Sequence, residues 1–217
     1  MKTQKFKTFI FDLDGTLLNT LNDLAASTNH ALLTNGMAER SIDEVRQFVG
    51  NGVRLLIERA VEPGTDKATI DRVFADFKTH YMHHSLDTTR PYDGIIDMLH
   101  ELHHRGIRIA VVSNKLYAAT RELCHHFFAD TVEVAIGEKE GIRRKPSPDT
   151  VIEAMLESGV DKADADYVGD SDVDIATAKN CGIPCISVLW GFRDKDFLIE
   201  HGAQTFVSHP SELLEFC

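Results

Sequence analysis

Two aspartates separated by one residue follow a short apolar run near the start of the chain. The run 9–11 is Phe-Ile-Phe, and Asp12-Leu-Asp-Gly-Thr comes directly after it. Because side chains alternate along an extended strand, the carboxylates of Asp12 and Asp14 point to the same side while Leu13 points away. Two carboxylates held this close repel each other, so they require a cation or separate roles in catalysis. The pair therefore indicates acid–base, nucleophilic or metal chemistry at the end of a strand.

A turn is the ordinary structural alternative for this segment. Asp14-Gly15 is typical of a two-residue β-hairpin loop, and such a loop needs no catalytic role. A hairpin also needs a second strand after the turn, whereas the residues from about 20 onward have helical spacing. For the segment alone the turn remains a serious alternative, so the rest of the chain must decide between the two.

Three further polar clusters occupy comparable places in the chain. They are Ser113-Asn114 after the apolar run 108–112, Lys145 just before the helix start Ser147-Pro148, and the run 169–174, which contains Asp170 and Asp174. Each alone has an ordinary explanation as a loop, a solvated basic run or a helix-capping carboxylate. Together with the first pair they place hydroxyl, ammonium and carboxylate groups at strand ends and helix starts. Those are the positions at which α/β proteins bind ligands and anions.

The elements that must position these groups alternate between strands and helices after residue 90. Short apolar runs predict strands at 8–11, 108–112, 132–136, 167–168, 185–189 and 205–207. Helical spacing predicts helices between them, as where Ile95, Met98, Leu99 and Leu102 recur at i, i+3, i+4 and i+7. Alternating strands and helices form a parallel sheet covered on both faces. The expected fold class is therefore α/β, with a Rossmann-like parallel sheet as its core.

The segment 20–86 interrupts this alternation with three or four consecutive helices and no convincing strand. Apolar stripes predict helices around 21–32, 53–60 and 70–81, and Ser41-Ile-Asp-Glu44 forms a capping box that starts another. We expect a core domain of residues 1–18 and 87–217 and an inserted cap of four-helix type over residues 19–86. Such a cap would hang over the carboxyl ends of the strands, where ligands bind.

Composition restricts the kind of partner. The chain has 217 residues, 43% hydrophobic and 26% charged, which suits a globular protein with a sizeable core. Its formal net charge of −11 argues against a broad basic face for nucleic acid, so an anion must bind at a local site. No apolar stretch approaches the roughly 20 residues of a membrane span, and residues 1–7 lack an apolar signal region. We expect a cytoplasmic monomer or homodimer without nucleic-acid or membrane partners.

With these clusters in view, the sequence resembles the haloacid dehalogenase superfamily of phosphotransferases. The four motifs of that family are matched in order by the run 12–16, by Ser113, by Lys145 and by the run 169–174. The helical insertion between the first two motifs is similar to the small C1 cap of the family. The runs 25–29, 48–53, 91–94 and 113–115 most resemble those of phosphoglycolate phosphatases. Asn19-Thr20 departs from the Asp-Ser that relatives often carry, outside the catalytic set.

The resemblance implies a magnesium-dependent phosphatase with an aspartyl-phosphate intermediate. Asp12 would attack phosphorus, and Asp14 would protonate the leaving alkoxide and then take a proton from water. The Asp12 and Asp170 carboxylates and the Asp14 backbone carbonyl would bind Mg²⁺. Asp174 would support the metal site from the outer shell. A carboxylate at position 14 argues against the dehalogenase branch of the family.

The resemblance also implies a phosphate seat made of the Ser113 hydroxyl, the Asn114 backbone amide and Lys145. Arg54, which follows the loop 50–52 of the cap, is a further expected substrate contact, although a plain interhelical turn explains that loop equally well. The expected substrate is a small phosphorylated metabolite, with 2-phosphoglycolate as the first choice. A β-phosphoglucomutase-like phosphotransferase, a pyrophosphatase and a non-catalytic binding relative are the alternatives. Lys115, after Ser113-Asn114, favours the phosphatase over the mutase, which usually carries small residues there.

Overall fold

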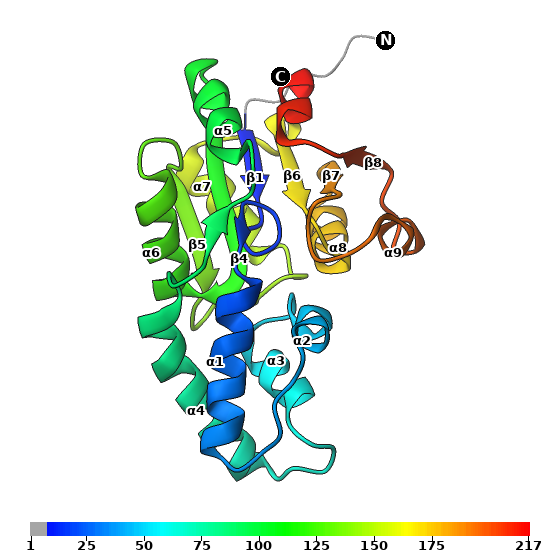
Figure 1. Ribbon diagram of the computed structural model, residues 1–217. Helices are drawn as coiled ribbons and strands as arrows, with labels where there is room; N and C mark the ends of the chain where they lie inside the picture. Colours follow the sequence, from blue (N-terminus) through cyan, green and yellow to red (C-terminus); the bar gives the residue numbers. More distant parts are fainter. Residues whose placement is uncertain (1–7) are drawn as a thin grey trace.

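A six-stranded sheet and a group of four helices form two adjacent parts in the computed structural model, which describes residues 8–217 (Figure 1). Every neighbouring pair in the sheet is parallel, and the order is β5-β4-β1-β6-β7-β8. The strands are β1 (Thr8–Phe11), β4 (Arg108–Leu116), β5 (Val134–Glu138), β6 (Ala165–Gly169), β7 (Cys185–Val188) and β8 (Thr205–Val207). Residues 1–7, for which the sequence predicts no signal region, lie outside the described residues.

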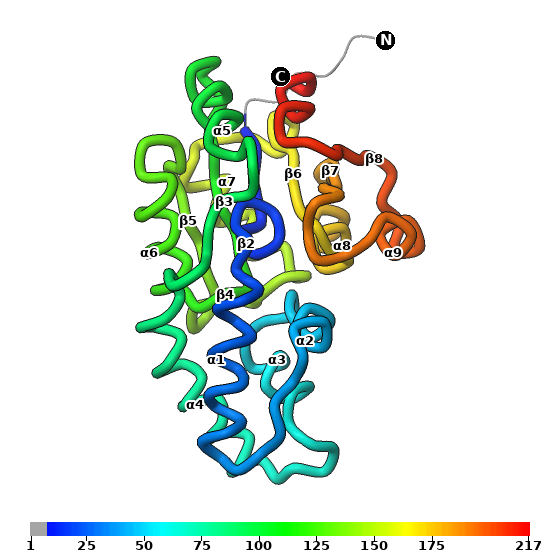
Figure 2. Tube along the Cα trace, in the orientation of Figure 1, coloured from blue at the N-terminus to red at the C-terminus, as the bar shows by residue number. Residues whose placement is uncertain are grey.

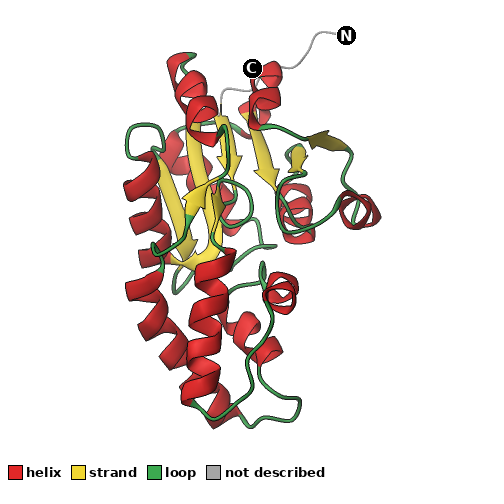
Figure 3. Ribbon diagram, viewed as in Figure 1, coloured by secondary structure: helices red, strands yellow, loops and turns green. Residues whose placement is uncertain are grey.

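Helices cover both faces of this sheet (Figure 3). Successive residues of β1 pack on opposite faces of the sheet. Phe9 and Phe11 pack against α5 and α6, whereas Ile10 packs against α7 and α8. The helices of this part are α5 (Ile95–His104), α6 (Tyr117–Phe128), α7 (Asp149–Ser158), α8 (Asp172–Cys181) and α9 (Lys195–Glu200), with 3₁₀ turns at Lys162–Asp164 and Pro210–Phe216. A strand buried on both faces belongs to the interior of an α/β sheet. The predicted Rossmann-like α/β class is confirmed.

The insertion between β1 and β4 is helical, as its apolar stripes predict. Its helices are α1 (Leu21–Thr34), α2 (Ile42–Phe48), α3 (Val53–Ala60) and α4 (Lys67–His84). The predicted capping box is present, because Ser41 Oγ accepts from the Glu44 backbone N–H and the Glu44 carboxylate accepts from the Ser41 N–H. The four helices enclose a second apolar core, which Ala119 and Phe192 of the sheet part also join. We call this group of four helices the cap.

Two short strands join the cap to the sheet, and the sequence does not predict them. β2 (Leu18–Asn19) and β3 (Arg90–Pro91) pair antiparallel, so the chain enters and leaves the cap at one place (Figure 2). β1 pairs instead with β4 and β6. The hairpin alternative for Asp14-Gly15 is therefore wrong, because the strand before this turn has no partner after it.

A buried carboxylate fastens the returning chain beside this junction. Asp23 of α1 accepts from the backbone N–H groups of Thr88 and Thr89, at 2.8–3.0 Å, and from both of their hydroxyls. Burial alone raises the pKa of Asp23, but the hydrogen bonds from both threonines outweigh it and hold this pKa below its usual value. The cap is thus tied to the sheet by ladder pairing and by this carboxylate. No helix in the described part of the chain has the length and apolar character needed to cross a membrane.

Candidate active site

The Asp12-Leu-Asp segment leaves β1 and turns sharply beneath the cap. The Asp12 N–H donates to the Val168 carbonyl at 2.9 Å, which continues the pairing of β1 with β6 by one residue. Leu13 is fully buried in the sheet core, while Asp12 and Asp14 both line a cavity between the sheet and the cap. The alternation expected from the sequence is therefore present in the structure.

Gly15 lets this turn approach the carboxylate that follows β6. Its φ is +86°, and a Cβ at this position would lie 2.4 Å from Asp170 Oδ2. Gly191 approaches Asp170 from the other side, where a Cβ would lie 2.3 Å from Asp170 Cβ. The Phe192 N–H donates to Asp170 Oδ2 at 2.6 Å. Two glycines therefore give Asp170 its place beside the first motif.

The end of β4 brings a lysine to Asp14. Lys115 Nζ lies 2.8 Å and 3.1 Å from the two Asp14 carboxylate oxygens, and Thr20 Oγ1 donates to Asp14 Oδ1 at 2.7 Å. The Lys115 side chain is 1% exposed. Sequence reasoning used Lys115 for the resemblance to phosphoglycolate phosphatases and to weigh phosphatase against mutase, but did not place it in the site. Strand alternation from Ser113 was the available signal, because residues i and i+2 share one face.

Ser113 and Asn114 stand where the sequence predicts, and Asn114 also links three segments. Ser113 lines the cavity, and its Oγ accepts from the Lys115 N–H at 3.2 Å. Asn114 Oδ1 accepts from the Lys145 N–H at 2.8 Å, and Asn114 Nδ2 donates to the carbonyls of Lys145 and Gly50 at 3.0 and 3.1 Å. The Asn114 side chain therefore connects β4 to the Lys145 loop and to the cap.

Lys145 lies behind Asp12. Its Nζ is 2.8 Å from Asp12 Oδ1, 2.8 Å from Asp174 Oδ1 and 2.9 Å from the Tyr167 hydroxyl. Burial alone lowers the pKa of this ammonium, but the two carboxylates outweigh it and raise the pKa above its usual value. Lys145 is therefore held as a cation next to the predicted nucleophile.

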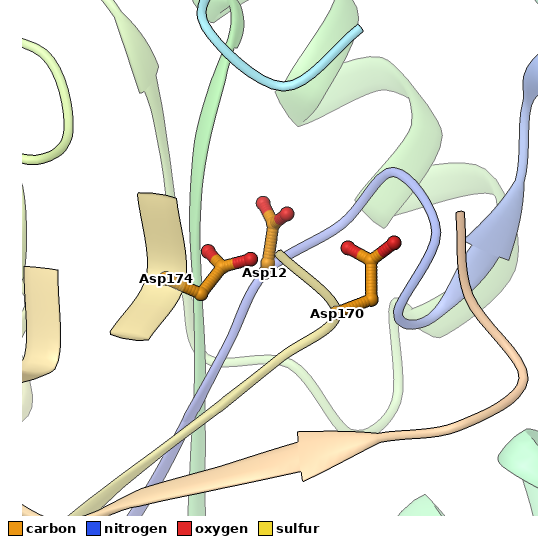
Figure 4. Close-up of side chains that lie close together, drawn as sticks. All are labelled: Asp12, Asp170 and Asp174. Carbon is orange, nitrogen blue, oxygen red and sulfur yellow. The ribbon is translucent and has the colours of Figure 1, made fainter. Parts of the chain in front are cut away.

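Three buried carboxylates, those of Asp12, Asp170 and Asp174, lie close together (Figure 4). One oxygen from each of Asp12, Asp170 and Asp174 lies within 4.8 Å of the others. Burial raises the pKa of Asp12 to about 7; Lys145 opposes this rise and the Asp174 carboxylate adds to it. Burial also raises the pKa of Asp170, and the carboxylates of Asp174 and Asp12 increase it further. A divalent cation offsets such crowding, and an all-oxygen donor set suits Mg²⁺.

Asp174 is the most constrained of the three carboxylates. Its Oδ1 accepts from Lys145 and from the Tyr167 hydroxyl, and its Oδ2 accepts from the Ser171 N–H and hydroxyl at 3.1 and 2.6 Å. Each oxygen thus already has two protein donors. This pattern favours the supporting role predicted for Asp174 over direct coordination, with Asp12 and Asp170 as the carboxylates available to a cation.

The structure does not bring Arg54 to the cavity. Its Nε donates to Glu58 Oε1 at 2.8 Å, its Nη1 pairs with Asp71, and its guanidinium lies over the Phe74 ring. The expected contact with substrate stays a prediction, and α3 turns residue 54 towards α4 in this structure. Sequence reasoning also missed Arg193, which lines the cavity.

Arg193 joins the loop after β7 to the cap. Its guanidinium donates to the carbonyls of Arg46 at 2.8 Å and Val49 at 2.9 Å, with a longer bond to the Gln47 carbonyl at 3.3 Å. These carbonyls lie at the C-terminal end of α2, where a positive charge is favoured by the unpaired acceptors. Because Phe192 contacts Asp170 and Arg193 contacts the cap, one short loop connects the carboxylate cluster with the cap.

Comparison with known proteins agrees with this site. Residues 9–188 match the family model described as haloacid dehalogenase-like hydrolase. A phosphoglycolate phosphatase of Agrobacterium fabrum is 36% identical over 190 residues, covering 85% of this chain and 81% of that protein. An N-acetylmuramic acid 6-phosphate phosphatase of Pseudomonas aeruginosa is 28% identical, covering 99% of this chain and 96% of that protein.

Solved structures show the same arrangement. The crystal structure of a candidate phosphoglycolate phosphatase from Lactobacillus delbrueckii subsp. bulgaricus superposes with a TM-score of 0.92 at 34% identity, covering 97% of this chain and 98% of that one. The motif-based resemblance is thus confirmed over most of the sequence. The chain belongs to the haloacid dehalogenase-like hydrolase family and is a phosphatase of that family.

Proposed function

We propose that this phosphatase hydrolyses 2-phosphoglycolate through an aspartyl-phosphate on Asp12. One observation carries the proposal: two carboxylates of one motif face one cavity, and each has its own buried lysine. Asp12 is paired with Lys145, and Asp14 is paired with Lys115. The similarity to phosphoglycolate phosphatases supports the choice of substrate. Phosphoryl transfer through a covalent intermediate requires a nucleophile and, next to it, a second group that acts as acid and base.

Asp12 is the nucleophile in this proposal. Lys145 holds Asp12 Oδ1, which leaves Oδ2 to attack phosphorus as the bond from phosphorus to the ester oxygen breaks. Asp14 gives a proton to the departing alkoxide, and Thr20 fixes the orientation of its carboxylate. Water then attacks the same phosphorus, its proton passes to Asp14, and the bond between Asp12 and phosphorus breaks. The products are glycolate and inorganic phosphate.

The phosphate seat follows from the groups around Asp12. The Ser113 hydroxyl, the Asn114 backbone amide and Lys145 provide the donors for the non-bridging oxygens. The Asp12 and Asp170 carboxylates and the Asp14 carbonyl would hold Mg²⁺. When bound, this ion supplies positive charge against the phosphate and the crowded carboxylates.

The cap then encloses the substrate. We infer a core domain of residues 1–18 and 87–217 and a cap domain of residues 19–86, joined at the pair β2 and β3. The lining that the cap contributes is apolar or glycine, namely Leu24, Val49, Gly50, Gly52, Val53 and Leu56. A sugar phosphate would place hydroxyls against this lining without partners, which costs free energy. This favours a small substrate over the β-phosphoglucomutase alternative.

The test is release of phosphate from a panel of esters by the purified chain, with and without Mg²⁺. The panel contains 2-phosphoglycolate, N-acetylmuramic acid 6-phosphate, β-glucose 1-phosphate and pyrophosphate. We expect the highest kcat/KM for 2-phosphoglycolate and dependence on Mg²⁺. Conversion of β-glucose 1-phosphate to glucose 6-phosphate, or preference for pyrophosphate, would overturn the proposal.

Two aspartate variants separate the chemistry from the fold. Asp12→Asn removes the nucleophile and is expected to lower kcat by about 10⁴-fold or more, as loss of a covalent nucleophile does in other enzymes. Asp172→Asn is the matched control, because Asp172 belongs to the fourth motif but does not line the cavity. It should retain wild-type activity. Equal activity of both variants would remove Asp12 from the mechanism.

A further inference from the structure

Positive charge is scarce in the cavity that would receive the substrate. Among its described lining residues, two carry a cation, Lys115 and Arg193. The Arg193 guanidinium is engaged by the backbone carbonyls at the end of α2. Lys145 is paired with Asp12 at the proposed phosphate seat and is not among the described residues that line the rest of the cavity, so we assign it to the phosphate and not to a second anionic group. Lys115 is therefore the cation that a second anionic group of a substrate would meet.

Lys115 already binds a carboxylate in this structure. Its Nζ contacts both oxygens of Asp14, and it lies 4.6 Å from the centre of the Tyr81 ring. The buried Tyr81 hydroxyl lies next to this ammonium. An ammonium has three donors and can serve more than one acceptor. The Lys115 ammonium is thus already placed to bind a carboxylate. The Tyr81 ring of α4 holds it there by a cation–π contact.

The spacing of Lys115 from the phosphate seat suits a short substrate. Ser113 and Lys115 are two residues apart near the end of β4. Both side chains line the same cavity. In 2-phosphoglycolate one carbon separates the ester oxygen from the carboxylate. A phosphate beside Ser113 therefore leaves the carboxylate close to the end of the Lys115 side chain.

We propose that Lys115 is the specificity-determining residue that binds the carboxylate of the substrate's leaving group. This role rests on the proposed function. It assigns recognition of the glycolate carboxylate to the ammonium of Lys115. The Asp14 carboxylate shares the ammonium with the substrate carboxylate when the ester is bound. The apolar cap lining encloses the remaining carbon, which needs no polar partner. A phosphoester without a carboxylate leaves one donor of Lys115 without its acceptor.

The experiment compares 2-phosphoglycolate with its uncharged amide, 2-phosphoglycolamide, which has nearly the same shape. For the wild type we expect kcat/KM to be about 100-fold higher for the acid, as a charge-assisted hydrogen bond provides. Lys115→Met keeps the length of the side chain and removes its charge. It should bring the acid-to-amide ratio close to one. If Lys115 serves Asp14 alone, both substrates lose activity equally and the ratio persists, which would overturn the proposal.

A matched lysine and a binding measurement complete the test. Lys139 pairs with Glu153 away from the cavity, so Lys139→Met should keep the wild-type ratio. In an Asp12→Asn background, calorimetry should show tighter binding of the acid than of the amide, and Lys115→Met should abolish the difference. If Lys115→Met does not fold, the wild-type ratio still decides, since a ratio near one contradicts the proposal. Wild-type enzyme that hydrolyses neither compound, but another ester, overturns the proposed function itself.

Discussion

Replacement of Gly15 by alanine tests whether the first motif must touch Asp170. The new Cβ would stand 2.4 Å from Asp170 Oδ2 and 2.9 Å from Phe192 Cδ2, whereas ordinary contact begins at 3.4 Å. To remove the clash, the new Cβ and the Asp170 carboxylate must therefore move apart by about 1 Å. Asp170 has little room to retreat, because Gly191 abuts it and the Phe192 N–H holds its Oδ2. A misplacement of this size in an active site costs about 100-fold in rate.

Backbone strain must be separated from this displacement, and Gly36 provides the control. It has a φ of +72°, against +86° at Gly15, and a Cβ at Gly36 meets nothing within 4 Å. Both alanine variants carry the left-handed strain of about 1–2 kcal/mol. For a protein of this size that lowers Tm by roughly 2–8 °C. Only Gly15→Ala should also lose activity.

The assay is Mg²⁺-dependent release of phosphate from 2-phosphoglycolate, together with thermal unfolding of each variant. We expect Gly15→Ala to lose about 100-fold in kcat/KM and to require more Mg²⁺ for half-maximal rate, because Asp170 is a proposed ligand. Gly36→Ala should stay within about twofold of wild type. If the two variants melt at similar temperatures and also show similar activity, close contact between Gly15 and Asp170 is not needed for catalysis.

Three further predictions concern charged groups. Burial raises the pKa of Asp166 from 3.8 to about 7, so the wild type loses stability as pH rises from about 4 to 7, where the unfolded carboxyl ionises first. Asp166→Asn should remove this loss and gain up to about 4 kcal/mol in denaturant unfolding at pH 8, with little gain at pH 4; equal gains at both pH values would contradict it. Arg193→Met removes the hydrogen bonds to the cap loop and should raise KM about tenfold with a smaller change in kcat; steady-state kinetics check this, and an unchanged KM would refute it. Arg54→Met should leave kcat/KM within about twofold and lower stability by less than about 1 kcal/mol, and a large kinetic loss would restore Arg54 to the site.

The strands could be located from sequence, but their ends could not where polar residues are buried. The prediction ends the strand that begins at residue 108 at residue 112, whereas β4 continues to Leu116. Ser113, Asn114 and Lys115 are all buried in it because each has a specific polar partner. Strand β6 also begins earlier than predicted, at Ala165, and includes the buried Asp166, although Asp166 Oδ1 has no hydrogen-bond partner among the described residues. Apolar runs mark buried strands because apolar side chains gain free energy on leaving water. This signal is missing where buried polar side chains are stabilised by hydrogen-bond partners instead.

The motif residues of the site could be predicted, because parallel strands bring their carboxyl ends to one edge. That rule places Asp12, Ser113 and Asp170 together without further information. Arg193 could not be found this way, since its partners are backbone carbonyls of a distant cap loop. The direction of the Arg54 side chain could not be predicted either, because a glycine loop does not define the helical phase that follows it. In α3 that phase turns Val53 and Leu56 to the cavity and Arg54 to α4.

The position of the insertion explains why the cap must form one wall of the site. The chain leaves the sheet after Phe11, forms the Asp12-Leu-Asp turn, and enters the cap through β2 only a few residues later. It returns through β3, which pairs with β2, and Leu18 of β2 forms a bridge with Asp14, so both connections lie beside the proposed catalytic carboxylates. A cap attached this closely has little freedom to lie elsewhere than over the strand ends. Substitutions in its lining should therefore change which ester is accepted, while the chemistry stays with residues of the sheet and of the turn after β1.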